Sequence, residues 1–553
     1  MMFLRGVHRS TPMLLLFGCC LAAQAHVGSP NVFFEGKAGE YAVHVVIRPP
    51  KVVPGLAEIS VRVPGEPVQH VTVLPVFWSA GRKGAPPPDE ARLVRGESNL
   101  YSAALWFMKS GAYSVDVNIQ GPRGQGTLVI PVNSAATNTR PMPMAYRVIL
   151  CALAIVLFVG ALKIAGAAFS ESRLDPEGLP TKKDRWRGRA AMIVTAGVLS
   201  LMLFGGKKWW DFEERNYRNN SLYKPVPVTA QVRTEREQHI LQMRVNASER
   251  RGQWTPLIPD HGKLMHLFLI GAEAPSAFAH LHPVRRSEAE FEAPLPPLPA
   301  GSYSLYADVT HENGFSETLT ASVVVPPAST AMKTLWLGTA TEPICSAATA
   351  QMLATNLFFP PDLDDAWQIG ELNKLNGLNK LNELNGGNDE QFSPQRQRIC
   401  NIASGYRMIW ENPGPLVENG DAFLRFKLVR ADNRPVLIEP YLGMPGHAVV
   451  WRQDGAVFAH VHPEGTFSMA ARQFFLKSQP NSSSLEPASL SPSATKLSGP
   501  ELHDTHTNAA GLPGELSFPY AFPQPGAYRL WVQAKSEGRI LTGVFDTTVA
   551  SIK

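Results

Sequence analysis

Most of the chain consists of short apolar or alternating runs of strand length, and two stretches are continuously apolar over the length of a long helix. Runs such as residues 41–47, 57–63 and 70–73 alternate or stay apolar, and Pro-Pro, Pro-Gly and Gly-Pro pairs punctuate the sequence around them. Three regions end in the same way, with Gly-x-Tyr opening a strand and one last strand after it. The pattern predicts a mainly β protein built from three β-sandwich modules.

The tyrosines of these closing patterns are Tyr113, Tyr303 and Tyr528. Their position resembles the tyrosine corner of immunoglobulin-like sandwiches, in which the hydroxyl bonds back to nearby backbone. The resemblance implies that these tyrosines determine the fold and that the modules are immunoglobulin-like. We expect the three sandwiches at residues 26–140, 224–328 and 403–553.

The two long apolar stretches, residues 145–169 and 190–206, lie between the first and second modules and are candidates to cross a bilayer. The intervening residues 170–189 contain six basic residues, which the positive-inside rule places in the cytoplasm. Trp209 and Trp210 are typical of the outer membrane–water interface. We therefore expect a transmembrane hairpin in the cell membrane (inner membrane), with both large soluble regions in the periplasm or outside. Two buried helices of a soluble domain are the alternative.

The N-terminus has the features of a secretory signal over residues 1–25: two arginines, an apolar core, and Ala-Gln-Ala as the cleavage site. Cleavage there makes His26 the first mature residue, and lipidation at Cys19 is the alternative. In an oxidising compartment Cys345 and Cys400 could form a disulfide, although two unrelated thiols fit the sequence as well.

Residues 329–402, between the second and third modules, include repeated Leu-Asn pairs and are expected to form a low-complexity linker, with a short helix as the alternative. The net charge of +5 over 553 residues gives no case for nucleic acid as a partner. The sequence contains no nucleophile elbow, phosphate loop or dinucleotide fingerprint, so we do not expect an enzyme.

Two near-copies of one histidine motif supply the candidate chemistry. Residues 278–283 are Phe-Ala-His-Leu-His-Pro, and residues 458–463 are Phe-Ala-His-Val-His-Pro. A further histidine, His266 or His447, precedes the first histidine of each copy by fourteen or thirteen residues. The intervening sequence predicts two strands and a turn, with Asp454-Gly455 as a strong hairpin signal in the second copy.

The hairpins predict that each histidine triplet gathers on one face. Residues i and i+2 of a strand point to the same face, so His280 and His282 project together, and so do His460 and His462. The two registers that the second turn allows place His447 opposite His460 or opposite His462. Either register brings three imidazoles close enough for a common ion.

Three imidazoles suit copper or zinc. Thioethers near the upstream histidines, from Met265 and Met444, would favour Cu(I). We therefore expect copper, as Cu(I) or Cu(II), at metal sites formed by these two methionines together with six histidines: His266, His280, His282, His447, His460 and His462. The alternative is that each His-x-His-Pro is a polar strand end that meets a turn and binds no metal.

A free α-amino group at His26 would add a second metal-binding nitrogen beside its imidazole, and His44 or His70 could complete that site. The start His-Val-Gly-Ser-Pro resembles that of CopC-type periplasmic copper-binding proteins, which are small β-sandwiches. The resemblance implies a copper ligand at His26, and a terminal histidine without metal is the alternative.

The second and third modules resemble the YtkA-like and FixH-like exported domains found around copper handling and respiratory oxidase assembly. The resemblance lies in the two His-x-His-Pro copies, with Met-His-Leu-Phe at residues 265–268 and Gly-Met-Pro-Gly-His at residues 443–447. It implies an exported location and copper chemistry. The two apolar stretches and the Leu-Asn linker depart from the one-domain members.

The expected function is a membrane-anchored, extracytoplasmic copper-binding protein for copper storage, relay or respiratory oxidase assembly. Its expected partners are the membrane and copper-donor or copper-acceptor proteins of the envelope. One alternative is a non-enzymatic envelope protein whose immunoglobulin-like modules bind another protein without metal. A second alternative is an enzyme with a copper centre at His26.

Overall fold

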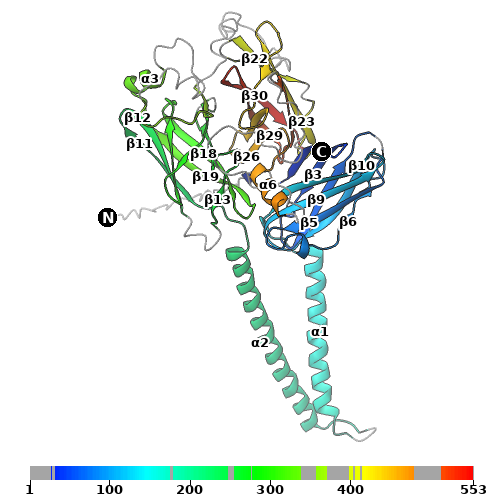
Figure 1. Ribbon diagram of the computed structural model, residues 1–553. Helices are drawn as coiled ribbons and strands as arrows, with labels where there is room; N and C mark the ends of the chain where they lie inside the picture. The colour runs from blue at the N-terminus through cyan, green and yellow to red at the C-terminus, as the bar shows by residue number, and fades with distance from the viewer. Residues whose placement is uncertain are drawn as a thin grey trace, which may run out of the picture.

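The computed structural model describes residues 26–27, 31–65, 67–174, 178–246, 254–273, 275, 277–337, 357–369, 398–402, 405–411, 414–478 and 512–551. These residues form a mainly β fold of antiparallel sheets, as expected, with two long helices between the first and second groups of sheets. The sheets gather at one end of the molecule, and the helices project from them as a pair (Figure 1). The expected signal sequence, Cys345 and the Leu-Asn repeats lie outside the described residues.

The first sandwich packs two antiparallel sheets on a core rich in valine, isoleucine and aromatic side chains. Its elements are β2 (Val32–Ala38), β3 (Tyr41–Arg48), β4 (Gly55–Arg62), β5 (His70–Phe77), η1 (Arg82–Gly84), β6 (Asp89–Glu90), β7 (Arg92–Leu93), β8 (Leu100–Phe107), β9 (Gly111–Gly121) and β10 (Gly124–Ser134). One sheet has the order β2-β3-β4-β8-β7 and the other β10-β9-β5-β6. Alternate residues of β4 are buried, so one face of this strand lies in the core.

The second sandwich has the same two-sheet construction. Its strands are β11 (Val228–Glu235), β12 (Gln238–Val245), β13 (Leu257–Ile258), β14 (His266–Gly271), β15 (Phe278–Leu281), β16 (Val284–Arg285), β17 (Glu290–Leu295), β18 (Gly301–His311), β19 (Ser316–Val325) and β20 (Ala366–Gln368). The order is β11-β12-β17-β16 in one sheet and β13-β18-β14-β15-β20 in the other, where β19 also pairs with β18. All six residues of β14 are buried, so this strand is covered on both faces.

The third sandwich repeats this arrangement. Its elements are β21 (Ile399–Ile402), β22 (Tyr406–Glu411), β23 (Asp421–Arg430), β24 (Leu437–Ile438), β25 (Gly446–Arg452), β26 (Val457–Val461), α6 (Met469–Lys477), β27 (Leu512–Pro513), β28 (Glu515–Ala521), β29 (Gly526–Ser536) and β30 (Arg539–Val549). One sheet has the order β21-β22-β23-β28, and β24 pairs with β27. The other sheet, β26-β25-β29-β30, receives β1 (His26–Val27) at its edge beside β26.

The tyrosine corner expected from the sequence is present in all three sandwiches. The hydroxyl of Tyr303 donates to the carbonyl of Pro299 at 2.8 Å, and that of Tyr528 donates to the carbonyl of Gln524 at 2.7 Å. In the first sandwich the backbone N–H of Lys109 donates to the Tyr113 hydroxyl at 3.1 Å. Each bond spans four residues and fixes the chain where it enters the penultimate strand.

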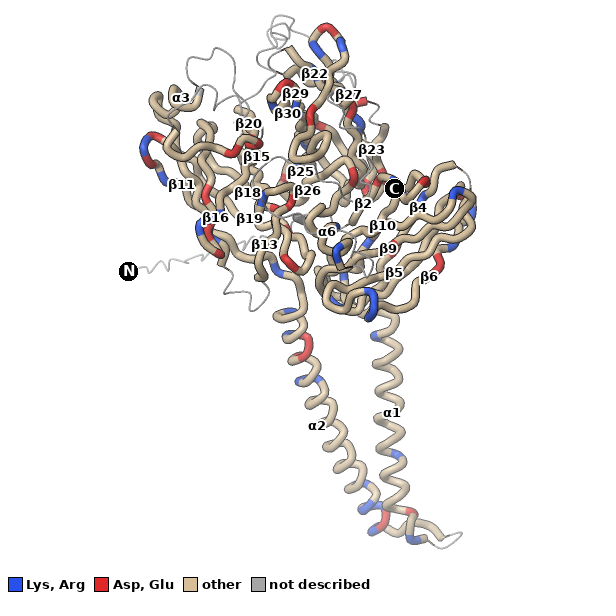
Figure 2. Tube along the Cα trace, in the orientation of Figure 1, with Lys and Arg blue, Asp and Glu red and all other residues tan. Residues whose placement is uncertain are grey.

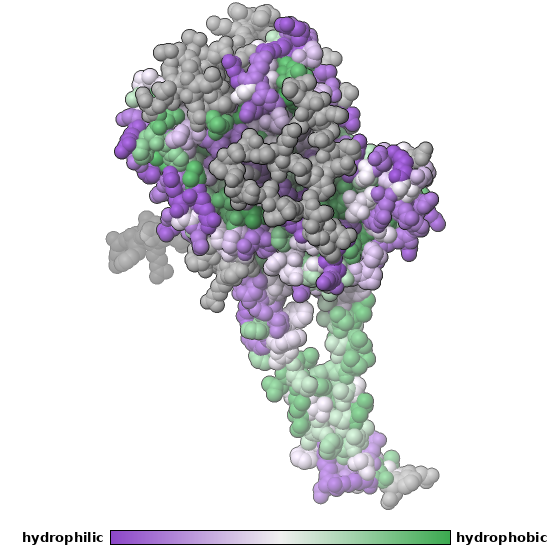
Figure 3. All heavy atoms as spheres, in the orientation of Figure 1, coloured by the Kyte–Doolittle hydropathy of each residue, from purple (hydrophilic) through white to green (hydrophobic). Residues whose placement is uncertain are grey.

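Helices α1 (Met144–Glu171) and α2 (Lys182–Asn220) are long and apolar enough to cross a membrane. Apolar side chains cover much of their surface, as Figure 3 shows. They approach closely where Gly188 lies against Gly166, since a Cβ on Gly188 would lie 2.8 Å from the Gly166 carbonyl oxygen. The expected pair of apolar helices between the first two modules is therefore present, and both are candidate membrane spans by length and composition.

The second helix differs in extent from the sequence-based prediction of a loop at 170–189 and a span at 190–206. Residues 182–189 form the first turns of α2, which continues to Asn220. The Thr181 side chain accepts a hydrogen bond from the N–H of Asp184, and the Asp184 carboxylate accepts one from the N–H of Thr181. This capping box starts the helix before the apolar stretch begins. The basic residues therefore cluster at the tip of the hairpin (Figure 2).

The prediction of a linker over residues 329–402 was wrong for three folded pieces, of which β21 belongs to the third sandwich. Helix α3 (Thr330–Leu337) and strand β20 both belong to the second sandwich, and the rings of Trp336 and Trp367 meet edge to face in its core, with centroids 5.5 Å apart. Strand β20 extends the sheet beyond β15. These apolar residues bury more surface than a solvated linker would, which holds both segments on the sandwich.

Candidate metal centre

The first histidine triplet lies on the β14–β15 hairpin. Phe268 pairs with His280, and Leu267 pairs with Leu281, a register that sets His266 opposite His282. Ligand-capable nitrogens of His266, His280 and His282 all lie within 4.8 Å of one another, and all three side chains are buried. The gathering of this triplet on one face, expected from strand alternation, is confirmed.

The second triplet lies on the β25–β26 hairpin in the same geometry. Val449 pairs with His460, a register that sets His447 opposite His462. This register is the one that a turn at Asp454-Gly455 produces. The nitrogens of His447, His460 and His462 likewise lie within 4.8 Å of one another.

The two triplets face each other across the interface of the second and third sandwiches. The ring centroid of His266 lies 5.4 Å from that of His460 and 6.5 Å from that of His447. The centroid of His280 lies 5.7 Å from that of His460 and 6.2 Å from that of His447. Centroids within a triplet are 4.5 to 5.5 Å apart, so the separation between triplets is only slightly larger. The six imidazoles form one buried cluster.

Apolar contacts beside the cluster hold the two sandwiches together. Tyr306 of the second sandwich stacks on Phe458 of the third with centroids 4.2 Å apart, and Trp531 of the third stacks on Phe278 of the second at 4.7 Å. These contacts are related by an approximate two-fold axis, since Tyr306 and Trp531 occupy equivalent strands, β18 and β29. The histidines therefore sit on a rigid, self-complementary interface.

Hydrogen bonds fix which nitrogen of each upstream histidine carries the proton. His266 Nε2 lies 3.2 Å from the carbonyl of Asp260, and His447 Nε2 lies 3.1 Å from the carbonyl of Tyr441. A carbonyl oxygen only accepts, so Nε2 is the donor in both rings and Nδ1 carries the lone pair. His266 Nδ1 then faces His280 Nε2 at 3.3 Å, and His447 Nδ1 faces the Nε2 of the corresponding His460 at 3.1 Å.

The downstream histidines are held from behind by residues of the opposite sandwich. His280 Nδ1 donates to Gln533 Oε1 at 2.9 Å, and His460 Nδ1 lies 3.3 Å from Asp308 Oδ2. The bond of His280 leaves its Nε2 unprotonated, so in the first triplet two lone pairs point at each other. The contact of His460 Nδ1 with a carboxylate oxygen favours the same arrangement in the second triplet. Two nitrogens in this relation repel each other unless a cation or a proton lies between them.

The third histidine of each triplet offers a further unpaired nitrogen. The Nε2 atoms of His282 and His462 are buried and have no hydrogen-bond partner among the described residues. His282 Nδ1 donates to Asp365 Oδ1 at 2.9 Å, and the backbone N–H of His282 donates to the same oxygen. A carboxylate behind a ligating imidazole orients the ring and raises its basicity, as in many protein metal sites. His282 also lies within reach of a second group, with Asp362 and Asp365, that could hold a metal ion.

Burial keeps the cluster in its neutral form. Desolvation first, and neighbouring imidazoles second, hold the pKa values of four histidines well below the usual range: His266, His280, His447 and His460. Burial and the nearby His261 lower the pKa of His462 to about 3. Neutral imidazole is the form that binds metal ions, so the pocket is prepared for a cation at neutral pH.

A seventh histidine, His261, joins the cluster from a turn of the second sandwich. Its ring centroid lies 5.0 Å from that of His462, 5.7 Å from that of His447 and 6.2 Å from that of His266. The sequence analysis missed His261 together with Asp365, Asp308 and Gln533. The signal for His261 is the dipeptide His261-Gly262, which fits a two-residue turn between short extended segments.

Of the other expected ligands, the structure separates Met265 from the cluster. Met265 points to the opposite face of its strand, into the core of the second sandwich with Leu267 and Leu269, because adjacent strand residues alternate. Met444 is buried in the turn that precedes β25, where its backbone pairs with that of Tyr441. The prediction that Met265 adds a thioether to the site was therefore wrong.

His26 lies in β1, beside Val457 of the third sandwich, and the structure describes its backbone alone. The two histidines that the sequence offered as its partners lie elsewhere. His44 packs against Phe423 with ring centroids 5.0 Å apart, and the exposed His70 bonds to Glu90. Neither belongs to a group of potential ligands among the described residues.

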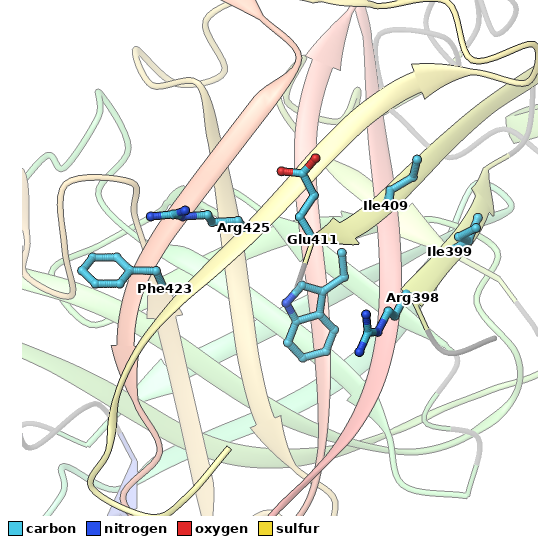
Figure 4. Close-up of a pocket in the computed structure, with 7 residues that line it drawn as sticks. Arg398, Ile399, Ile409, Glu411, Phe423 and Arg425 are labelled. Atoms are coloured by element: carbon cyan, nitrogen blue, oxygen red, sulfur yellow. The ribbon is translucent and has the colours of Figure 1, made fainter. Parts of the chain in front are cut away.

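A surface hollow of about 820 Å³ lies on the other sheet of the third sandwich, and no histidine of the cluster lines it. Figure 4 shows Glu411 of this hollow with arginines on either side. Its lining residues are Arg398, Ile399, Ile409, Trp410, Glu411, Phe423 and Arg425. It contains no histidine or cysteine, so the candidate chemistry of the described residues stays with the imidazole cluster.

Comparison with known proteins finds that the two histidine-bearing sandwiches are similar to one family model. A family model described as a domain of unknown function, DUF8832, matches residues 225–326 and 401–551, which contain both triplets. No curated protein matches the chain.

Among solved structures, an engineered protein is 19% identical with a TM-score of 0.15, and the match covers 18% of this chain and 21% of the engineered chain. PorU from Porphyromonas gingivalis is 9% identical with a TM-score of 0.13, over 95% of this chain and 34% of PorU. A protein from Corynebacterium diphtheriae described as membrane-anchored is 7% identical with a TM-score of 0.13, over 95% and 96% of the two chains. The chain thus spans a minor part of the first two proteins.

Proposed function

We propose that this protein is a membrane-anchored, extracytoplasmic copper-binding protein that holds copper for storage, for relay, or for assembly of a respiratory oxidase. The observation that carries the proposal is the pair of buried imidazole triplets. In each, two ring nitrogens face each other at 3.1 to 3.3 Å. Nitrogens that both bind one ion at about 2.0–2.1 Å come this close to each other, so the geometry fits a common cation.

The donor set supports copper as the metal. Three neutral imidazoles per ion suit copper and zinc, whereas calcium and magnesium require oxygen ligands. The carboxylates of Asp365 and Asp308 lie behind the imidazoles, where they stabilise a bound cation without displacing a ring nitrogen. Because the cluster is buried, retention of the ion is favoured over rapid exchange with solvent.

Metal retention by the full-length protein in detergent tests this proposal. The protein is stripped with a chelator at neutral pH, offered Cu(I), Cu(II) or Zn(II) separately, desalted, and analysed for bound metal. We expect about two copper equivalents, one per triplet, and a loss of copper in His280→Ala and in His460→Ala. The control is His70→Ala, which removes an exposed histidine outside the cluster. Copper absent from the desalted wild type would end the metal proposal and favour a role in protein interaction.

The location outside the cytoplasm is supported by the basic tip of the hairpin, since basic loops stay in the cytoplasm. Thiol labelling of intact cells with a membrane-impermeant reagent tests it, in a background without native cysteines. We expect Leu93→Cys, at an exposed position of the first sandwich, to react in intact cells once any outer membrane has been permeabilised. Leu179→Cys, near the tip of the hairpin, should react only after the cells are lysed. The reverse pattern would place the sandwiches in the cytoplasm.

A further inference from the structure

We propose that the two triplets hold two metal ions in one shared centre between the second and third sandwiches, and that His261 is a fourth ligand of the ion in the third sandwich. This inference rests on the proposed metal-binding function and deepens it. It replaces two independent storage sites with a single two-metal centre whose ions have unequal surroundings.

The sharing follows from how the triplets are supported. The imidazole of His280 belongs to the second sandwich but is oriented by Gln533 of the third, and that of His460 belongs to the third but is oriented by Asp308 of the second. Neither triplet is therefore complete within its own module. The stacked aromatic residues beside them fix the spacing of the two hairpins, so the triplets cannot separate without opening the interface.

His261 reaches from the second sandwich to the triplet of the third. Its ring lies 5.0 Å from that of His462, a distance within the range found inside each triplet. Its side chain is 7% exposed, and its buried Nε2 has no hydrogen-bond partner among the residues that the structure describes. Asp260 Oδ1 lies 3.7 Å from this nitrogen, beyond hydrogen-bond distance, and the ring packs beside those of His462, His447 and His266, so the imidazole is available as a ligand.

The equivalent turn of the third sandwich shows that His261 is an addition rather than a requirement of the fold. Backbone hydrogen bonds join Asp260 to Lys263 around His261, and the same pair of bonds joins Tyr441 to Met444 around Leu442. His261 has φ of 52° and Leu442 has φ of 53°, so both turns use the same left-handed conformation. A leucine therefore fits this backbone position as well as the histidine does.

The result is an asymmetric centre. The ion of the third sandwich would take four nitrogens from two modules, a closed set typical of tightly held ions. The ion of the second sandwich would take three nitrogens, with Asp365 and Asp362 nearby, and would keep a coordination position for an exchangeable ligand. The less saturated ion is the one through which copper would enter or leave.

Electron paramagnetic resonance of the full-length protein in detergent, loaded with Cu(II), tests the shared centre. We expect two bound equivalents whose spectrum shows coupling between the two spins. The variants His280→Gln/His282→Gln and His460→Gln/His462→Gln should each bind one ion with an uncoupled spectrum. Two results would overturn the shared centre while leaving metal binding intact. The wild-type protein could bind two copper ions whose spins are not coupled, or it could bind a single copper ion that is lost in either double variant. Absence of bound copper would instead refute the proposed function.

The variant His261→Leu tests the fourth ligand. In the His280→Gln/His282→Gln background, where only the third-sandwich ion remains, we expect the substitution to lower the number of nitrogens seen in the copper spectrum from four to three and to weaken copper in competition with a chelator. In the His460→Gln/His462→Gln background the same substitution should change neither quantity. An unchanged nitrogen count in the first background, or an equal loss in both, would show that His261 does not ligate. As a folding control, the single variant His261→Leu should unfold at the same temperature as the wild-type protein, which would confirm that the turn is intact.

Discussion

The buried neutral histidines make the metal-free protein sensitive to acid, and the size of the effect can be worked out. In the unfolded chain an imidazole has a pKa near 6.5. In the folded protein, burial holds the pKa values of five cluster histidines below that value, as described for the imidazole cluster. Below pH 6.5 these five groups therefore bind more protons in the unfolded state than in the native state, whereas burial raises the pKa of the neighbouring Asp308 to about 7, which acts in the opposite direction. Stability is consequently retained above pH 6.5 and lost as the pH falls from 6.5 toward the native pKa values.

The expected loss at pH 5.0 is large. Each histidine that stays neutral in the native state costs about 1.36 kcal/mol per pH unit below 6.5, or about 2 kcal/mol at pH 5.0. Five such histidines give an upper bound of about 10 kcal/mol, which is comparable to the whole stability of a typical domain. The sum is an upper bound because the imidazoles of one cluster titrate together.

Urea unfolding of the metal-free, full-length protein in detergent at pH 7.0, 6.0 and 5.0 measures this effect. Tryptophan fluorescence reports on the interface through Trp451 and Trp531. We expect His460→Gln to reduce the pH dependence by up to about 1.4 kcal/mol per pH unit, and the exposed His70→Gln to leave it unchanged. Copper should shift the loss of stability to lower pH, because protons and the metal compete for the same nitrogens. A metal-free protein equally stable at pH 7.0 and 5.0 would refute the account of neutral, desolvated imidazoles.

Three further substitutions test the supports of the cluster. Asp365→Asn removes the carboxylate behind His282 and should weaken one of two copper ions by about 10- to 100-fold in chelator competition, and unchanged affinity would show that the carboxylate is not part of the site. Trp531→Ala removes the ring stacked on Phe278 and should cost about 3–5 kcal/mol of unfolding free energy in urea titration, against no change if the interface does not form. Tyr528→Phe removes the tyrosine-corner hydrogen bond and should cost about 1 kcal/mol by the same assay, with no loss of copper.

Local patterns were sufficient to predict the modules and each triplet separately. The Gly-x-Tyr sequences marked three tyrosine corners, and the period of two in the strands placed His280 with His282 and His460 with His462. The same period also shows why the expectation for Met265 was wrong, since it precedes His266 by one residue and must point the other way.

The meeting of the two triplets could not be derived from local pattern, because it depends on packing between residues almost two hundred positions apart. One signal does point to it: β14 and β25 are apolar at nearly every position. An antiparallel strand with one solvated face alternates polar and apolar residues, so a continuous apolar run indicates that the second face is covered as well. The identity of the covering sheet is known only from the folded chain. The same is true of Asp365, which contacts His282 from a segment whose sequence resembles a linker.

Duplication of one sandwich within a single chain explains both the position of the centre and its asymmetry. Two copies of one surface pack about a two-fold axis, so residues near that axis meet their own counterparts, as the stacked pairs beside the histidines do. A dimer of one module would keep both halves identical. In one chain each copy can change alone, and the second copy has Leu442 where the first has His261, and Gln533 where the first has Asp308. Storage of two equal ions requires no such difference, whereas passing an ion on requires one position that holds it less firmly, so the asymmetry favours relay over storage.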